Sequence, residues 1–180
     1  MVSVDCDEYA AMLVSKNWDG VAEYLARGVG RLVLAEVDVL VICSNTAHIA
    51  VPRVRHLFPS LPVLHIADST AKDICDKGLG RVGLLGTEPT MREDYLKAQL
   101  GRHGLEVLVP EEDAELRQIF QFIMDELGFG EFKESTRAFF VDQVRQLSAR
   151  GAEGVILGCT EIELLVRQKD VPEDVPLFAS

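Results

Sequence analysis

Short, continuously apolar runs alternate along this chain with longer segments of helical period. A strand that is apolar on both faces belongs in a sheet covered on both sides, and helices between such strands indicate parallel pairing. The pattern therefore predicts an α/β fold. The expected strands are residues 2–4, 39–42, 63–66, 82–85, 107–109, 155–157 and 175–178, and the expected helices are about 19–36, 47–57, 69–77, 91–103, 112–127, 134–150 and 161–168.

Two sets of such units fit the 180 residues better than one continuous sheet. The stretch "DKGLGRVG" (76–83) carries two closely spaced glycines between a predicted helix and a predicted strand. Glycine loosens the backbone, so we expect a seam there. The predicted organisation is a first lobe over residues 1–78 and a second over residues 79–180.

Composition excludes several classes of function. The formal net charge of −11 disfavours a broad surface for nucleic acid or an anionic membrane. The first ten residues carry acids where a signal peptide needs a basic region, and charged residues interrupt the longest apolar stretch. The four cysteines are widely separated, and their spacing is not that of a metal site. We therefore expect no stabilising disulfide bonds and a reducing, cytoplasmic environment.

Two cysteines stand at predicted strand ends. Cys43 follows the run 39–42, and Cys159 follows the run 155–157 after one glycine. Ligands of parallel α/β sheets gather at this edge, and the N-terminus of a following helix favours a thiolate. Each cysteine alone could be an inert core residue, and Thr160 and Glu161 could be an ordinary helix cap and dipole partner. Matching cysteines in both halves favour a chemical role.

The stretch "RVGLLGTEPTM" (81–91) ends a predicted strand in glycine and continues with Thr87 and Thr90. A glycine turn with hydroxyls at a helix N-terminus can cradle a carboxylate or a phosphate. The spacing matches neither a dinucleotide fingerprint nor a P-loop. A capped turn without a ligand is the alternative. His48 could form a couple with Cys43 or be a first-turn helix residue, and His65 is expected in the core.

Together these residues resemble the aspartate/glutamate racemase family, in particular its aspartate and broad-specificity amino-acid racemase branch. The matching pieces keep the family's order over essentially the whole chain: "VICSNTAH", "LPVLHIAD", "RVGLLGTEPTM", "GEFKESTRAFF" and "GAEGVILGCTEIELLV". The resemblance implies two flavodoxin-like lobes with parallel sheets, related by a pseudo-twofold axis. It further implies an amino-acid substrate between the lobes, no pyridoxal phosphate or other cofactor, no metal, and a homodimer.

The resemblance also implies roles for particular residues. Cys43 and Cys159 become the two acid/base thiols, which act on opposite faces of the α-carbon with their sulfurs roughly 7 Å apart. Glu161 is implied to orient Cys159 or to contact the ammonium group, and Lys133 to meet a side-chain carboxylate. The remaining implied substrate contacts are Asn45, Thr46, Thr87, Thr90 and Thr160.

The chain departs from the family pattern at both ends. The family's first strand with its glycine-rich loop and its last long helix have no counterpart in this sequence, so we expect a truncated first lobe with exposed strand edges. Acids and neutral groups in "VSVDCDEY" favour broad specificity, whereas Lys133 favours an acidic substrate. Two alternatives stay open: a non-catalytic family member, and a dicarboxylate cis–trans isomerase that attacks through Cys43.

Overall fold

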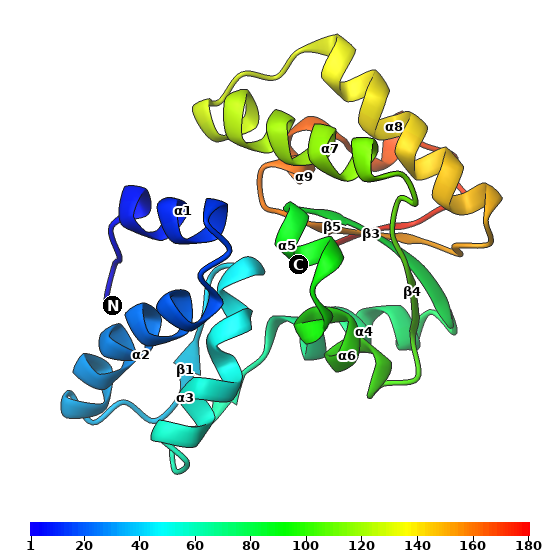
Figure 1. Ribbon diagram of the computed structural model, residues 1–180. Coiled ribbons are helices and arrows are strands. Elements are labelled where there is room, and N and C mark those ends of the chain that lie inside the picture. The colour runs from blue at the N-terminus through cyan, green and yellow to red at the C-terminus, as the bar shows by residue number, and fades with distance from the viewer. The chain divides into compact units, whose positions relative to one another are not determined.

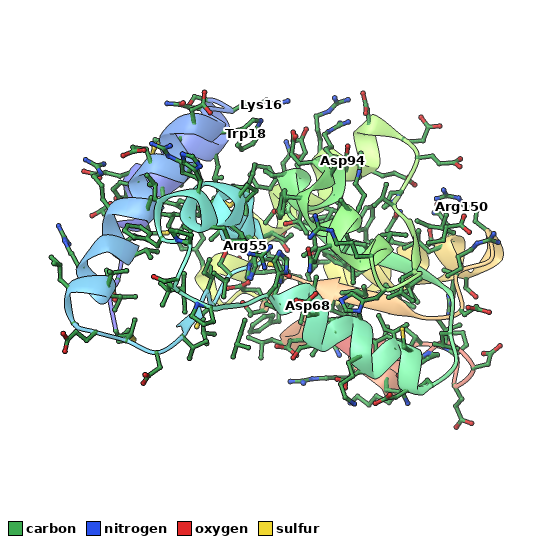
Figure 2. The ribbon with its side chains drawn as sticks, turned by 90° about the horizontal axis from the view of Figure 1, so that it is seen from below. Lys16, Trp18, Arg55, Asp68, Asp94 and Arg150 are labelled. Atoms are coloured by element: carbon green, nitrogen blue, oxygen red, sulfur yellow. The ribbon has the colours of Figure 1, made fainter.

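The computed structural model describes residues 1–180, which divide by their contacts into two units, Met1–Ile66 and Ala67–Ser180 (Figure 1). The boundary lies twelve residues before the predicted seam at 78/79, because helix α4 (Ile66–Asp76) packs with the second unit. Asp68 of α4, labelled in Figure 2, explains this placement. Its Oδ1 accepts a hydrogen bond from Gln99 Nε2 at 2.6 Å and lies 2.7 Å from His103 Nε2.

The first unit is mostly helical around a small parallel sheet. Helix α2 packs against α1, η1 and α3. Strands β1 and β2 are parallel, with Leu40 opposite Val63. The elements are α1 (Cys6–Val14), α2 (Trp18–Leu34), β1 (Leu40–Val41), the 3₁₀ helix η1 (Thr46–Ala50), α3 (Val51–Leu57) and β2 (Val63–Leu64).

The N-terminal segment differs from its prediction. Residues 2–4 form no strand, because no neighbouring strand lies beside them to pair with their backbone. Helix α1, which the apolar pattern missed, begins after Asp5, whose carboxylate accepts from the N–H groups of Asp7 and Glu8, both at 3.0 Å. A carboxylate in this position satisfies backbone donors that the first turn leaves unpaired.

The second unit is a four-stranded parallel sheet covered by helices on both faces. Its strand order is β4-β3-β5-β6. Figure 1 shows α7, α8 and α9 on one face and α4 and α6 on the other. The elements are β3 (Arg81–Gly86), α5 (Glu88–Arg92), α6 (Asp94–Gly101), β4 (Glu106–Leu108), α7 (Asp113–Asp125), the 3₁₀ helix η2 (Leu127–Phe129), α8 (Glu134–Ala149), β5 (Val155–Gly158), α9 (Ile162–Leu165), the 3₁₀ helix η3 (Gln168–Asp170) and β6 (Leu177–Ala179).

The predicted α/β class with parallel sheets is confirmed, and the order in the second unit is that of a flavodoxin-like sheet. All four residues of β5 are buried, as expected for a strand covered on both faces. The predicted helix 91–103 is two helices, α5 and α6, separated at Glu93, whose extended backbone breaks the helical path. No helix in the structure is both long enough and apolar enough to cross a bilayer.

The carboxyl ends of β3 and β5 approach each other closely. Gly86 and Gly158 are register partners in these two strands. A Cβ atom on Gly86 would lie 2.9 Å from the carbonyl oxygen of Gly158 and 3.1 Å from Cγ2 of Thr90. The strand order reverses between β3 and β5, which is where ligands of such sheets bind. Both strand ends therefore require glycine at the position that precedes the candidate site residues.

We predict that Gly86→Ala destabilises the second unit by roughly 1–3 kcal/mol, because the added methyl group overlaps a backbone carbonyl. The measurement is urea unfolding followed by circular dichroism. Gly101→Ala is the matched control, since nothing lies within 4 Å of a Cβ atom there, and its midpoint should be unchanged or higher. Equal midpoints for Gly86→Ala and the natural sequence would contradict the close approach.

Candidate active site

The second unit brings a thiol, a hydroxyl and a carboxylate together just after β5. Glu161 Oε2 accepts hydrogen bonds from Cys159 Sγ at 2.9 Å and from Thr160 Oγ1 at 2.8 Å. Cys159 is 8% exposed, whereas Thr160 lies at the surface. The short helix α9 starts at Ile162. One carboxylate oxygen therefore fixes the directions of both neighbouring side chains.

This arrangement keeps Cys159 protonated. Burial, together with the hydrogen bond to Glu161 and the negative charge of that carboxylate, raises the pKa of Cys159 to about 12. Backbone N–H groups of Glu161 and Ile162 act in the opposite direction, but their effect is smaller. The expectation that the helix N-terminus favours a thiolate is therefore wrong for Cys159, because α9 has only four residues and a carboxylate stands beside the sulfur.

Glu161 is the charged partner of the pair. Burial alone would raise the pKa of Glu161, but the hydrogen bonds donated by Cys159 and Thr160 outweigh it and hold the pKa below its ordinary value. At neutral pH the proton therefore resides on the sulfur, and the carboxylate is ionised.

Hydroxyl groups line the neighbouring strand end after β3. Thr87 caps α5 by accepting from the N–H group of Thr90, and the two Oγ1 atoms lie 2.9 Å apart. Thr90 Oγ1 also lies 3.1 Å from Tyr95 Oη on α6. The structure thus places both predicted threonines at the strand end adjacent to that of Cys159. Tyr95 was missed, because no motif in the sequence connects it with the glycine turn.

In the first unit, Cys43 lies two residues beyond the end of β1 and is exposed. Asn45 and Thr46 follow it at the start of η1, and both are buried. These three predicted residues therefore share one short loop at the carboxyl end of a strand, as expected. The predicted separation of the Cys43 and Cys159 sulfurs stays a prediction.

His48 does not act as a partner of Cys43 in this loop. Its Nε2 accepts from the N–H group of Ile66 at 3.1 Å, so its Nδ1 carries the ring proton and donates to the carbonyl oxygen of Ser44 at 2.7 Å. The ring centroid also lies 4.4 Å from that of His65. His48 therefore joins the Cys43 loop to the end of β2, and His65 is the core histidine that the sequence predicts.

Tyr9 of α1 is a second residue that the sequence reasoning missed. Its hydroxyl oxygen is buried close to Ser44, the residue after Cys43. Burial raises the pKa of Tyr9 to about 12, against the opposing effect of the Ser44 side chain. The hydroxyl is therefore protonated and can donate near the loop. No pattern could have indicated it, since α1 itself was not predicted.

Lys133 is held by acids of its own unit. Its Nζ lies 3.1 Å from Glu126 Oε1 and 3.2 Å from Glu131 Oε2. Glu126 also accepts a short hydrogen bond from Thr136. The hydrogen bond to Glu126, followed by that to Glu131, raises the pKa of Lys133. A substrate carboxylate would have to compete with these two partners.

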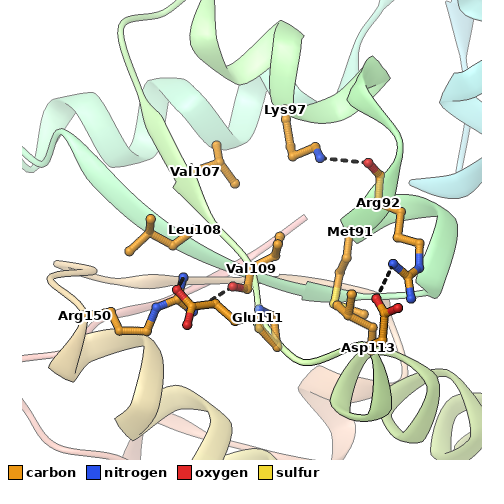
Figure 3. Close-up of a pocket in the computed structure, with 11 residues that line it drawn as sticks. Met91, Arg92, Lys97, Val107, Leu108, Val109, Glu111, Asp113 and Arg150 are labelled. Carbon is orange, nitrogen blue, oxygen red and sulfur yellow. Dashed lines mark hydrogen bonds and ion pairs between the residues drawn. The ribbon is translucent and has the colours of Figure 1, made fainter.

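A separate cavity of about 440 Å³ opens beside the carboxyl end of β4 (Figure 3). Its cationic side chains have partners. Arg92 pairs with Asp113 at 2.7 Å, Lys97 donates to the carbonyl oxygen of Arg92 at 2.8 Å, and Arg150 pairs with Glu111 at 3.0 Å. These charges connect α5, α7, α8 and the strand end to one another. The structure contains no cluster of three His, Cys, Asp or Glu side chains that could hold a metal ion.

Comparison with known proteins places this geometry in a family. The model of the Asp/Glu/Hydantoin racemase family matches residues 2–180. A curated glutamate racemase from Stutzerimonas stutzeri (strain A1501) is 28% identical over 143 residues, which cover 77% of this chain and 52% of that protein. The chain spans about half the length of the curated relatives it matches.

Two solved structures are similar over almost the whole chain. A crystal structure of a candidate Asp/Glu racemase from Yersinia pestis has a TM-score of 0.84 and 36% identity, and the match covers 98% of this chain and 75% of that one. An aspartate racemase homologue from Pyrococcus horikoshii OT3 has a TM-score of 0.74 and 34% identity over 91% of this chain and 70% of that one.

We predict that Glu161→Gln lowers the pKa of Cys159, because the substitution removes the neighbouring negative charge and the strongest acceptor of the thiol proton. The measurement is the rate of iodoacetamide alkylation of the peptide that contains Cys159, from pH 7 to pH 10. Each unit of lowering raises the thiolate fraction about tenfold at a given pH below the pKa. Glu163→Gln, on the adjoining helix α9, is the control and should leave the rate unchanged. Equal rates for both variants would contradict the assignment.

Proposed function

Because the chain belongs to the Asp/Glu/hydantoin racemase family, we propose that it inverts the α-carbon of an amino acid by proton exchange between two thiols, without a cofactor. The observation that carries the proposal is the hydrogen-bonded Cys159–Glu161 pair at the carboxyl end of β5, the strand paired with the threonine-lined end of β3. Inversion needs a base on one face of the carbon and an acid on the other.

The protonation of Cys159 defines its role in one direction of the reaction. The Cys43 thiolate removes the α-proton, and the electron pair of the C–H bond stays on the α-carbon. The Cys159 thiol then gives its proton to the opposite face. At the end, Cys43 is a thiol and Cys159 a thiolate, so the reverse direction starts from exchanged roles. The thiols return to their first state by exchanging protons with solvent.

Glu161 controls how readily Cys159 gives and regains its proton. Its negative charge holds the proton on the sulfur before the reaction. After transfer, the N–H groups of Glu161 and Ile162 stabilise the thiolate, which the carboxylate opposes. Cys159 is therefore the acid in the direction described above, and it acts as the base in the reverse direction only while it is a thiolate.

The hydroxyl groups of Thr87, Thr90 and Thr160 are proposed to bind the substrate's carboxylate and ammonium groups, together with Asn45 and Thr46. Donors placed around developing negative charge stabilise a carbanion in proportion to how well they are oriented beforehand. The capping contact between Thr87 and Thr90 supplies such orientation.

A reducing compartment, in which both thiols stay reduced, suits this chemistry.

For the substrate, we propose broad acceptance of α-amino acids. Lys133 is engaged by Glu126 and Glu131, and this supports a pocket without a dedicated cation for a side-chain carboxylate. We predict that Lys133→Met changes the ratio of kcat/KM for aspartate to that for alanine by less than tenfold. A loss of more than a hundredfold with aspartate alone would instead assign Lys133 to the substrate side chain, since a lost charge-assisted contact has about that magnitude.

The unequal environments of the two cysteines also favour a second candidate, the cis–trans isomerisation of an unsaturated dicarboxylate. Cys43 is exposed and Cys159 is buried and protonated, so one thiol could attack while the other serves as an acid. A covalent adduct trapped on Cys43, in a protein whose turnover survives Cys159→Ala, would support this candidate over racemisation.

We predict that Cys43→Ala and Cys159→Ala each lower racemisation by roughly 10²–10⁴-fold or more, because each removes one of the two proton-transfer groups. The measurement is the loss of circular dichroism from single enantiomers of aspartate, glutamate and alanine. Cys75→Ala is the matched control, since Cys75 is exposed on α4 and contacts the carbonyl oxygen of His103. The absence of racemisation of all three amino acids by the folded natural sequence would contradict the proposal.

A further inference from the structure

Three hydroxyl groups form a row beside the carboxyl end of β3, and we call it the hydroxyl row. Thr87 Oγ1 lies 2.9 Å from Thr90 Oγ1, which in turn lies 3.1 Å from Tyr95 Oη. Thr90 is fully buried, whereas Thr87 is half-buried. Thr87 is therefore the outer member of the row, and Tyr95 stands behind the two threonines of the proposed substrate site.

The break between α5 and α6 brings Tyr95 to Thr90. Successive residues of an α-helix turn by about 100°, so a residue five positions further along a continuous helix would point about 140° away. Glu93 has an extended backbone and interrupts that helical path. Lys97 holds the resulting corner by donating to the carbonyl oxygen of Arg92 at 2.8 Å. The chain thus changes direction between the two residues, and their oxygen atoms meet.

Packing fixes the direction of the Thr90 hydroxyl group. A Cβ atom on Gly86 would lie 3.1 Å from Thr90 Cγ2, and one on Gly158 would lie 3.4 Å from the same methyl group. The methyl group therefore fills the space that the two glycines leave open at the strand ends. Because threonine is branched at Cβ, a methyl group held there also sets the position of the hydroxyl oxygen.

Each hydroxyl group has one proton, so the direction of donation along the row decides what Thr87 can bind. A phenol is a stronger hydrogen-bond donor and a weaker acceptor than an aliphatic alcohol, which favours donation from Tyr95 to Thr90. Thr90 then donates to Thr87, whose oxygen also accepts from the N–H group of Thr90. In this direction the Thr87 hydroxyl group donates outward. A carboxylate can accept from it, whereas an ammonium group only donates.

From this geometry we infer that Tyr95 is a positioning residue, which orients the hydroxyl groups of Thr90 and Thr87 so that Thr87 donates to the substrate's α-carboxylate. Hydrogen bonds in a chain polarise one another, so Tyr95 also strengthens the contact that Thr87 makes. The inference rests on the proposed function, because it takes the end of β3 as part of an amino-acid site.

The first test is Tyr95→Phe, which removes only the hydroxyl group. We expect KM for aspartate to rise about tenfold while kcat changes less than about threefold, because a contact made equally in the ground state and the transition state affects binding alone. Tyr24→Phe is the matched control, since Tyr24 Oη on α2 accepts from the N–H group of Asp5, and it should leave KM unchanged. An unchanged KM in Tyr95→Phe would overturn the inference.

A double-mutant cycle tests whether Tyr95 acts through Thr90. Thr90→Val keeps the methyl group against the glycines and removes the middle hydroxyl group. Adding Tyr95→Phe to Thr90→Val should therefore raise KM by less than about twofold, whereas Thr90→Ser, which retains the hydroxyl group, should preserve the full response to Tyr95→Phe. A further tenfold rise in the Thr90→Val protein would contradict the inference, because Tyr95 would then act on its own.

Binding without turnover separates this inference from the proposed function. In the double variant Cys43→Ala/Cys159→Ala, isothermal titration gives the Kd of L-aspartate and that of its α-amide, which lacks the charged α-carboxylate. We expect tighter binding of L-aspartate, and a preference that Tyr95→Phe reduces about tenfold, because a charged acceptor gains most from a well-directed donor. This result together with no racemisation by the natural sequence would contradict the proposed function alone. A preference that Tyr95→Phe leaves unchanged, or no binding of L-aspartate, would overturn the inference.

Discussion

The close approach of β3 and β5 at their carboxyl ends is the constraint on which the candidate site depends. Gly86 and Gly158 face each other there without side chains, so the residues that follow them leave the sheet side by side. Thr87 and Thr90 follow one strand, and the Cys159–Glu161 pair follows the other. The reversal of strand order between β3 and β5 opens the sheet at this place, which is where parallel α/β sheets accommodate ligands.

The two cysteines differ in a way that their matching sequence positions conceal. Cys43 is exposed after a short strand, whereas Cys159 is buried and bound to Glu161. Two thiols that exchange protons across one carbon must hold opposite protonation states before each turnover. The environment that keeps Cys159 protonated is consistent with an acid role for this thiol in the proposed two-thiol reaction.

Much of this organisation could be predicted from the sequence. The runs 82–85 and 155–157 are short, without polar side chains and separated by helices, so they predicted buried parallel strands correctly. Cys43 and Cys159 could be placed at strand ends for the same reason. The pattern could not predict α1, whose start depends on the Asp5 cap, because capping by one side chain leaves no apolar periodicity.

Side-chain contacts over a distance were also outside the reach of the sequence. The partners of Lys133 follow from how α8 begins beside Glu126, and the ring of His48 is fixed by the backbone of Ile66. The pKa of Cys159 depends on burial and on the orientation of one carboxylate, and the residue order "CTE" specifies neither. Segment 2–4 has valine at two of its three positions, as a strand could, but strand pairing requires a neighbouring strand, and none pairs with this segment in the structure.

The most direct test of the two-thiol account follows the α-proton itself. A single enantiomer is incubated with the protein in deuterated water, and deuterium at the α-carbon is measured in both enantiomers at low conversion. Two thiols on opposite faces predict that the product enantiomer carries solvent deuterium while the recovered substrate carries almost none. Equal deuterium in both enantiomers, or retention of the original proton in the product, would contradict the account, because a single group would then be removing and returning the proton.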